Sequence, residues 1–70
     1  MPDLSDYKTV LYRQPDGSWV AYVPAIGGCH AVMPTREGAL TELENVFNVI
    51  REEFAAEGKE LPADVELVHA

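Results

Sequence analysis

The chain has 70 residues, of which 5 are basic and 12 acidic, and its formal net charge at pH 7 is -7. This length allows one domain of the smallest self-folding size and excludes a second. The five basic residues are scattered and the net charge is negative, so direct binding to nucleic acid is disfavoured, because such binding needs clustered Lys and Arg. The hydrophobic content of 47% is enough to build a core.

Cysteine use and hydropathy indicate where the protein works. Cys29 is the only cysteine, so an internal disulfide is impossible. A single thiol without a signal-peptide pattern predicts a cytoplasmic protein. No apolar run approaches the roughly 18 residues that a membrane span requires, so we expect no association with a membrane.

Strands are expected in the first half of the chain. Residues 1–6 show no periodicity and predict a frayed start. Residues 7–13 are rich in β-forming side chains, and the Pro and Gly within 14–18 are typical of a hairpin turn. A second strand is expected over 18–23 and a short third strand over 29–33. Together these segments predict a three-stranded meander.

A long helix is expected over about residues 36–57. Thr35 can cap its start, and Gly58 can adopt the left-handed conformation that ends many helices. Apolar side chains recur at intervals of three and four, which places them on one face. They are Ala39, Leu40, Leu43, Val46, Phe47, Ile50 and Phe54.

The alternation of apolar residues over 65–68 predicts a short final strand. The sequence therefore predicts one small α+β domain in the order β-β-β-α-β. An antiparallel three-stranded sheet would carry the helix on one face, and Phe47 and Ile50 would lie over the face formed by Trp19, Ala21 and Val23.

The other face of the predicted sheet has no helix to cover it. Val20 and Tyr22 belong to that face. Tyr12 and Tyr22 lack the basic groove that accompanies base-stacking aromatics, so they are more typical of a core or a protein interface. An uncovered face and an open sheet edge favour association. We therefore expect a homodimer or larger homo-oligomer, with Tyr12, Val20 and Tyr22 at a protein interface.

An ordered set of motifs resembles the N-terminal domain of the HicB-like antitoxins. The resemblance covers about residues 7–67, and two positions depart from the usual pattern: Met33-Pro34 stands where the family has Gly-Asp, and Gly38 stands where it has a second Glu. The motifs are DGSWVAYVPAIGGC over residues 16–29, Thr-x-Glu-x-Ala over 35–39 and EGKELP over 57–62.

The resemblance implies a partial ribonuclease-H-like fold and the neutralisation of a small basic RNA-cleaving toxin of the HicA type by protein-protein occlusion. The acidity of residues 36–70, which hold nine acidic and three basic side chains, suits a basic partner. The family's second, DNA-binding domain would not fit after residue 67, so none is expected here. The alternative is an orphan HicB-like module that forms oligomers without a toxin partner.

Catalytic and metal sites are disfavoured by the same sequence. Two-metal nuclease chemistry needs a carboxylate on the first strand, and residues 7–13 have none. Cys29 and His30 are consecutive, so a strand would point them to opposite faces, and His69 stands one residue from the end. Cys29, His30 and His69 also lack the spacing of metal ligands. We expect no catalytic residue, no metal and no cofactor.

Overall fold

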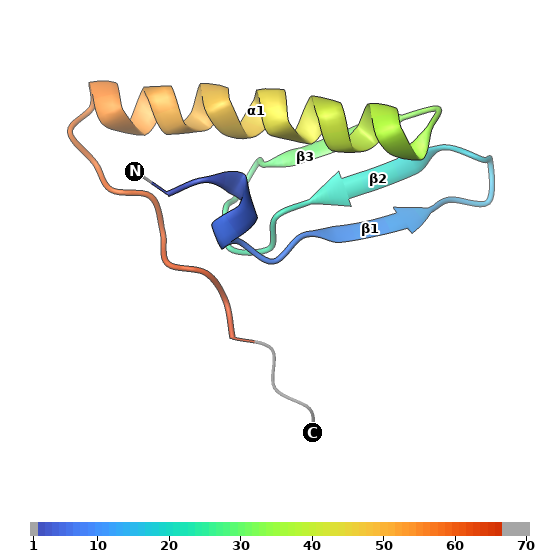
Figure 1. Cartoon of the computed structure of the whole chain (residues 1–70), viewed down its shortest axis with the longest axis horizontal. Helices are drawn as coiled ribbons and strands as arrows, with labels where there is room; N and C mark the ends of the chain where they lie inside the picture. Colours follow the sequence, from blue (N-terminus) through green and yellow to red (C-terminus); the bar gives the residue numbers. More distant parts are fainter. Residues whose placement is uncertain (1, 67–70) are drawn as a thin grey trace.

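The computed structural model describes residues 2–66 of the chain. In this part, three strands and one long helix form an α+β domain in the order β-β-β-α, as predicted (Figure 1). A short 3-10 helix precedes the first strand. The elements are η1 (Leu4–Asp6), β1 (Val10–Arg13), β2 (Trp19–Tyr22), β3 (His30–Met33) and α1 (Arg36–Ala56).

The strands form an antiparallel sheet in the order β1-β2-β3. The predicted hairpin joins β1 to β2: Gln14 N–H donates to Ser18 O at 2.8 Å, and Gly17 has a φ of 93°, which favours glycine. The Asp16 carboxylate closes the turn by accepting from the hydroxyl (2.6 Å) and the N–H (2.9 Å) of Ser18. These hydrogen bonds, that of the hydroxyl above all, lower the pKa of Asp16.

Both predicted ends of the helix are confirmed. At the start, Thr35 Oγ1 accepts a hydrogen bond from Gly38 N–H at 3.0 Å. At the end, Gly58 has a φ of 69°, and Lys59 N–H turns back to Phe54 O at 2.8 Å. This is a Schellman arrangement, which satisfies carbonyls that the last helical turn would otherwise leave unpaired.

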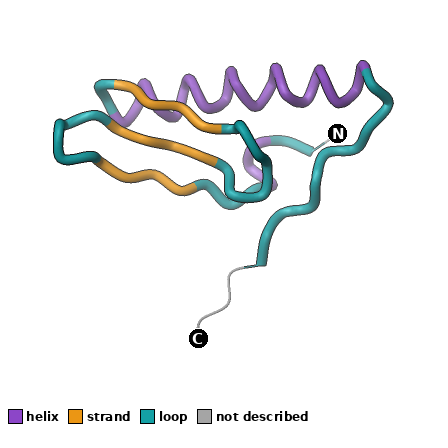
Figure 2. The backbone as a smooth tube through the Cα atoms, turned by 180° about the vertical axis from the view of Figure 1, so that it is seen from behind, coloured by secondary structure: helices purple, strands orange, loops and turns teal. Residues whose placement is uncertain are grey.

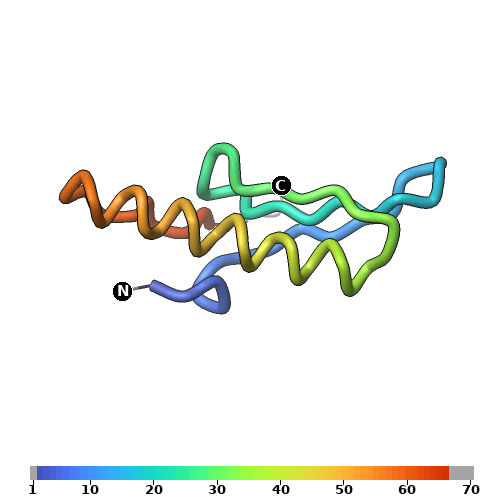
Figure 3. Tube along the Cα trace, turned by 90° about the horizontal axis from the view of Figure 1, so that it is seen from above, coloured from blue at the N-terminus to red at the C-terminus, as the bar shows by residue number. Residues whose placement is uncertain are grey.

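Helix α1 packs on β2 and β3, in a layer of its own (Figures 2 and 3). The contact is close because small side chains meet there: Ala39 of the helix, Ala21 of β2 and Ala31 of β3 are all buried. Leu43 and Phe47 fill the space next to them and are at most 1% exposed. The predicted face of the helix is therefore the buried one.

The start of the chain is ordered, so the prediction of a frayed segment is wrong for residues 4–6. Leu4 packs against the core. The N-terminal segment that contains it, drawn in dark blue, lies beneath α1 (Figure 1). Asp3 N–H donates to Asp6 Oδ2 at 2.8 Å, and Arg51 of α1 donates to Asp3 Oδ1 at 3.2 Å. The packing of Leu4 and the hydrogen bond from Arg51 are tertiary contacts, which is why a local pattern did not reveal them.

The segment after the helix runs back past the start of the chain without joining the sheet. It contains no strand through residue 66, so the first half of the final strand predicted over 65–68 is absent. Residues 67–68 lie outside the described part. The backbone of this segment is instead held by side-chain contacts.

Two contacts tie this segment to the residues before β1. The Tyr7 hydroxyl donates to Pro62 O at 2.5 Å. The Asp64 carboxylate accepts from Lys8 Nζ at 2.9 Å and from Lys8 N–H at 3.2 Å. The hydrogen bond from the Lys8 side chain is the main cause of the lowered pKa of Asp64. We refer to these two contacts as the clasp.

Truncation of Phe47 tests the packing of the helix. Phe47→Ala should lower the free energy of unfolding by about 3 to 5 kcal/mol, because it leaves a cavity in a core of this size. Glu44→Ala, on an exposed position of the same helix, should change it by less than about 0.5 kcal/mol. Urea unfolding followed by circular dichroism measures both. The reverse ranking would mean that the helix is rotated from the position described.

The clasp predicts a specific dependence of stability on pH. Because folding lowers the pKa of Asp64, its contribution is complete above its unfolded pKa and is lost as the pH falls through the folded value. Asp64→Asn should therefore be less stable than the unmodified chain near neutral pH, and the difference should shrink between about pH 5 and pH 2. Glu60→Gln, an exposed carboxylate of the same segment, is the control. A difference independent of pH would contradict the role of the Asp64 charge.

Candidate functional site

The register of the sheet collects one set of side chains on the face away from α1. Side chains alternate along a strand, and Ala21 and Ala31 belong to the covered face because they are buried with the helix. Their neighbours in the chain therefore belong to the other face. Pairing aligns them in two rows across the strands, and we call the six together the open face: Tyr12, Val20 and Val32 in one row, and Val10, Tyr22 and His30 in the other.

The open face is apolar and carries no Lys, Arg, Asp or Glu side chain. Tyr12 is 47% exposed and Val32 is 51% exposed. Val20 lies between them in the central strand and is only 7% exposed. Large apolar side chains that are this exposed and stand in one row across a sheet are typical of surfaces that bind other proteins.

The three residues predicted for a protein interface, Tyr12, Val20 and Tyr22, lie together on the open face. Val20 contributes less surface than expected, because its cross-strand neighbours cover it. The sequence analysis missed Val32, the most exposed member of the Val20 row. Alternation along the predicted third strand could have put Val32 on one face, but only the register shows which face that is.

The exposed carboxylates of α1 lie on the opposite side of the molecule. The helix forms one layer and the open face is the outer surface of the other (Figure 3). The acidic surface of the helix and the apolar open face are thus separate. A small partner bound to the open face would not touch the helix carboxylates. The exposed carboxylates of the helix and its cap are those of Glu37, Glu44, Glu52, Glu53 and Glu57.

Cys29 is a core residue. It lies just before β3 and is 1% exposed, and burial raises the pKa of its thiol. A raised pKa keeps the sulfur protonated at neutral pH and therefore weakly nucleophilic. His30 is exposed on the open face, and His69 lies outside the described residues. The arrangement of Cys29 is that of a structural thiol.

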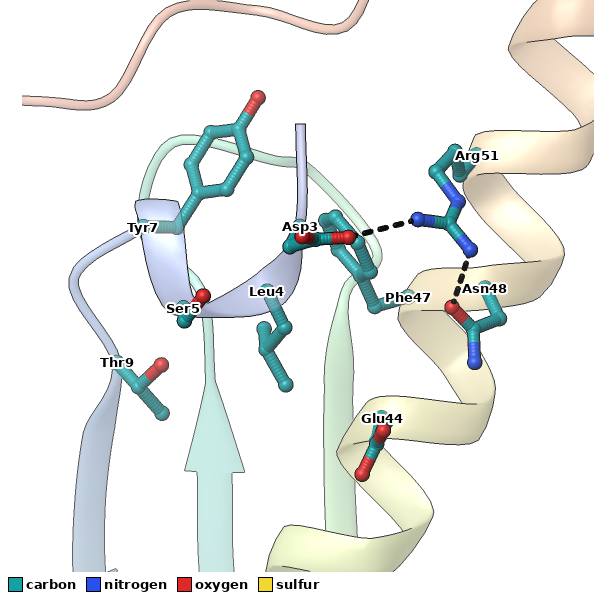
Figure 4. A pocket seen from close by; sticks show the side chains of 9 residues that line it. All are labelled: Asp3, Leu4, Ser5, Tyr7, Thr9, Glu44, Phe47, Asn48 and Arg51. Atoms are coloured by element: carbon teal, nitrogen blue, oxygen red, sulfur yellow. Dashed lines mark hydrogen bonds and ion pairs between the residues drawn. The ribbon is translucent and has the colours of Figure 1, made fainter. Parts of the chain in front are cut away.

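A hollow of about 560 Å³ lies between the N-terminal segment and α1 (Figure 4). Arg51 closes one side: it donates to Asp3 at 3.2 Å and to Asn48 at 3.0 Å, and its guanidinium carbon lies 5.7 Å from the centre of the Phe47 ring. Its charge is therefore already engaged within the chain. The hollow is lined by Asp3, Leu4, Ser5, Tyr7, Thr9, Glu44, Phe47, Asn48 and Arg51.

The polar groups of this hollow are not arranged for catalysis. Ser5 is the only serine in it, and neither a histidine nor a cysteine lines it. Burial is the main cause of the raised pKa of Tyr7, whose hydroxyl is engaged with Pro62. A serine without a neighbouring base is not activated as a nucleophile. The contacts here attach η1 to the helix.

Two further properties can be stated for residues 2–66. Within this range, no three His, Cys, Asp or Glu side chains come together as a group that could hold a metal ion. The single long helix there is too polar to cross a bilayer.

Comparison of the chain with protein-family models, with curated proteins and with solved structures gave no match.

The burial of Cys29 predicts slow thiol chemistry. In the folded protein at pH 8, Cys29 should react with a disulfide reagent such as DTNB at least about a hundredfold more slowly than in the urea-unfolded chain, because reaction must wait for opening of the core. Absorbance of the released thiolate measures both rates. Rapid stoichiometric labelling of the folded protein would show that the thiol is accessible.

Proposed function

We propose that this chain is a protein-binding domain that works as a HicB-like antitoxin, covering a small basic RNA-cleaving toxin of the HicA type. The observation that carries the proposal is the open face. It is an uncharged, apolar surface, exposed at Tyr12 and Val32, on a chain whose net charge is -7. The resemblance of the motifs to the HicB-like family supports the choice of partner.

The open face has the properties of a binding surface with a low entropic cost. Its side chains stand on three paired strands, and Val20 is already packed between its neighbours. Tyrosine has only two side-chain torsions and presents a large contact area, so Tyr12 and Tyr22 are suited to anchor a partner. Binding there would order little that the fold has not ordered already.

The acidic helix surface would act at a distance. The layer of strands lies between the helix and a toxin on the open face, so the helix carboxylates would stand about 10 Å or more from the contact. At physiological salt the Debye length is about 8 Å, and charges that far from the contact affect the encounter more than the bound state. The acidic charge should therefore increase the association rate, while the apolar contact sets the lifetime of the complex.

The open face would serve equally well in an orphan module without a toxin. The two functions differ in the partner. An antitoxin would bind a small basic protein encoded beside it, and that protein, if encoded there, is the candidate toxin; the orphan module would have no such partner.

Surface plasmon resonance with that candidate toxin tests the proposal. Tyr12→Lys should raise the dissociation constant at least about tenfold, because it puts a charge into the apolar contact. Raising the salt concentration should slow association of the unmodified chain and leave its dissociation rate nearly unchanged.

Asn45→Lys is the matched control, since it adds the same charge at an exposed position of α1. It should alter binding by less than about threefold, through the association rate alone. If Asn45→Lys weakened binding more than Tyr12→Lys, the toxin would occupy the helix surface. No binding by the unmodified chain would reject the antitoxin function and leave the orphan module.

A further inference from the structure

The sheet has two outer edges, and neither β1 nor β3 has a second strand partner within residues 2–66. The hydrogen bonds at the ends of the ladders show which groups point outward. Gln14 N–H donates to Ser18 O, so pairs at intervals of two from this one, such as Tyr12 with Val20, are the hydrogen-bonded pairs. The backbone groups of Leu11 and Arg13 consequently point away from the sheet.

The outer edge of β3 follows from the same alternation. Val23 N–H donates to Cys29 O at 3.0 Å, so Ala31 is in a hydrogen-bonded pair with β2. The N–H and C=O of Val32, and the C=O of His30, therefore point outward. The N–H of His30 is already engaged with Gly28 O at 3.1 Å.

The two edges differ in how they are protected against pairing with another strand. Natural proteins place charged side chains on edges that must stay unpaired. The β1 edge has the exposed Arg13 within the strand and Lys8 just before it. The β3 edge, His-Ala-Val-Met, carries no Lys, Arg, Asp or Glu. Only Pro34, which follows the strand, limits pairing there, and it does so at one end.

We infer that the β3 edge pairs, antiparallel, with β3 of a second copy of this chain. Pro34 has no N–H, so the ladder cannot extend past it, and the free groups are those of His30 and Val32. A two-fold axis at Ala31 pairs the free groups of both residues, because Val32 N–H of each copy then donates to His30 O of the other. The product is a continuous six-stranded sheet with both open faces on the same side.

A second copy is the occupant that the free backbone groups of β3 favour, because they match under a two-fold axis and the strand has no charge to oppose the pairing. An antiparallel pair of identical strands places like residues symmetrically about the axis, and like charges opposite each other destabilise a sheet. The β3 strand has no such charge, although the chain as a whole has a net charge of -7. A basic partner would have no acidic side chain on β3 to bind. A second neutral β3 strand does not require a charged side chain opposite it.

Strand pairing alone would be too small an interface. Four residues of strand are about 13 Å long, and a stable complex buries about 800 Å² per partner. The flank of α1 next to β3 supplies further area, which is apolar at Val46 and Val49 and carries the carboxylates of Glu42 and Glu53 beside them. Arg51 and Asn48 face the N-terminal segment, so Val46 and Val49 lie on the other flank, and Val49 is 54% exposed. Figure 1 shows α1 along the β3 side of the sheet, so the two helices would lie side by side.

Sedimentation velocity on the purified chain, without any toxin, tests this inference. The unmodified chain should form a dimer that strengthens with salt, because salt screens the repulsion between two chains of charge -7. Val32→Pro removes an N–H that points away from β2, so it should raise the dimer dissociation constant at least about tenfold while circular dichroism stays native. Val49→Glu, at an exposed helical position, should weaken the dimer similarly, because it adds a carboxylate to a flank that already carries Glu42 and Glu53.

Tyr12→Lys is the matched control, because Tyr12 is as exposed as Val32 but stands on β1. It should leave the dimer intact. A monomer at hundreds of micromolar protein would overturn the inference, as would a dimer that Tyr12→Lys disrupts and Val49→Glu does not. The chain can form the dimer without binding a toxin, and it can bind a toxin without forming the dimer. The two experiments therefore test this inference and the proposed function independently.

Discussion

The close approach of the helix to the sheet is the constraint on which the remaining structure depends. Ala39 of the helix is buried in one cluster with Ala21 and Ala31 of the sheet, and side chains this small allow the two layers to approach closely. Leu43 and Phe47 then fill the volume beside the contact. A single helix covers a single face, so the same packing that makes the core leaves the other face of the sheet to solvent. The core and the candidate binding surface are thus two results of one arrangement.

This arrangement also separates the chemistry of the two sides. The helix has to present polar residues outward, and most of these are glutamates, so the acidic charge accumulates in one layer. The strands alternate, and the residues opposite the buried alanines are Val and Tyr. A domain of this size cannot bury both faces of its sheet, so the apolar side chains of Tyr12 and Val32 remain exposed to solvent. The acidic side chains of the helix point away from the open face, so the open face carries no charge.

Features that depend on a few neighbouring residues could be predicted from the sequence. The turn over residues 14–18, the Thr35 cap and the glycine exit at Gly58 each need only local chemistry, and the spacing of three and four fixed the buried side of the helix. Gly38 is instructive because a glycine in the first turn of a helix suggests only a weakened helix start. In the structure, a Cβ at Gly38 would lie 2.8 Å from Thr35 Oγ1, so the glycine leaves room for the cap.

Features that depend on contacts between distant residues could not be predicted. η1 is held by Leu4 in the core and by Arg51, which is 48 positions away from Asp3. The candidate site was predicted in part: alternation placed Tyr12 and Tyr22 at a surface, but the covering of Val20 and the exposure of Val32 depend on cross-strand pairing. The register depends on how β1, β2 and β3 pair with one another, so the sequence of one strand alone does not determine it.

The clasp has a consequence for the order of folding. Tyr7 and Pro62 are 55 positions apart, so their hydrogen bond closes a loop that contains the whole sheet and the helix. Closing so long a loop in a disordered chain is entropically unfavourable, whereas the hairpin and the helix form from near neighbours. The clasp should therefore be the last part to assemble and the first to open. Hydrogen exchange would detect such opening as a local event, at a lower free energy than exchange in the core.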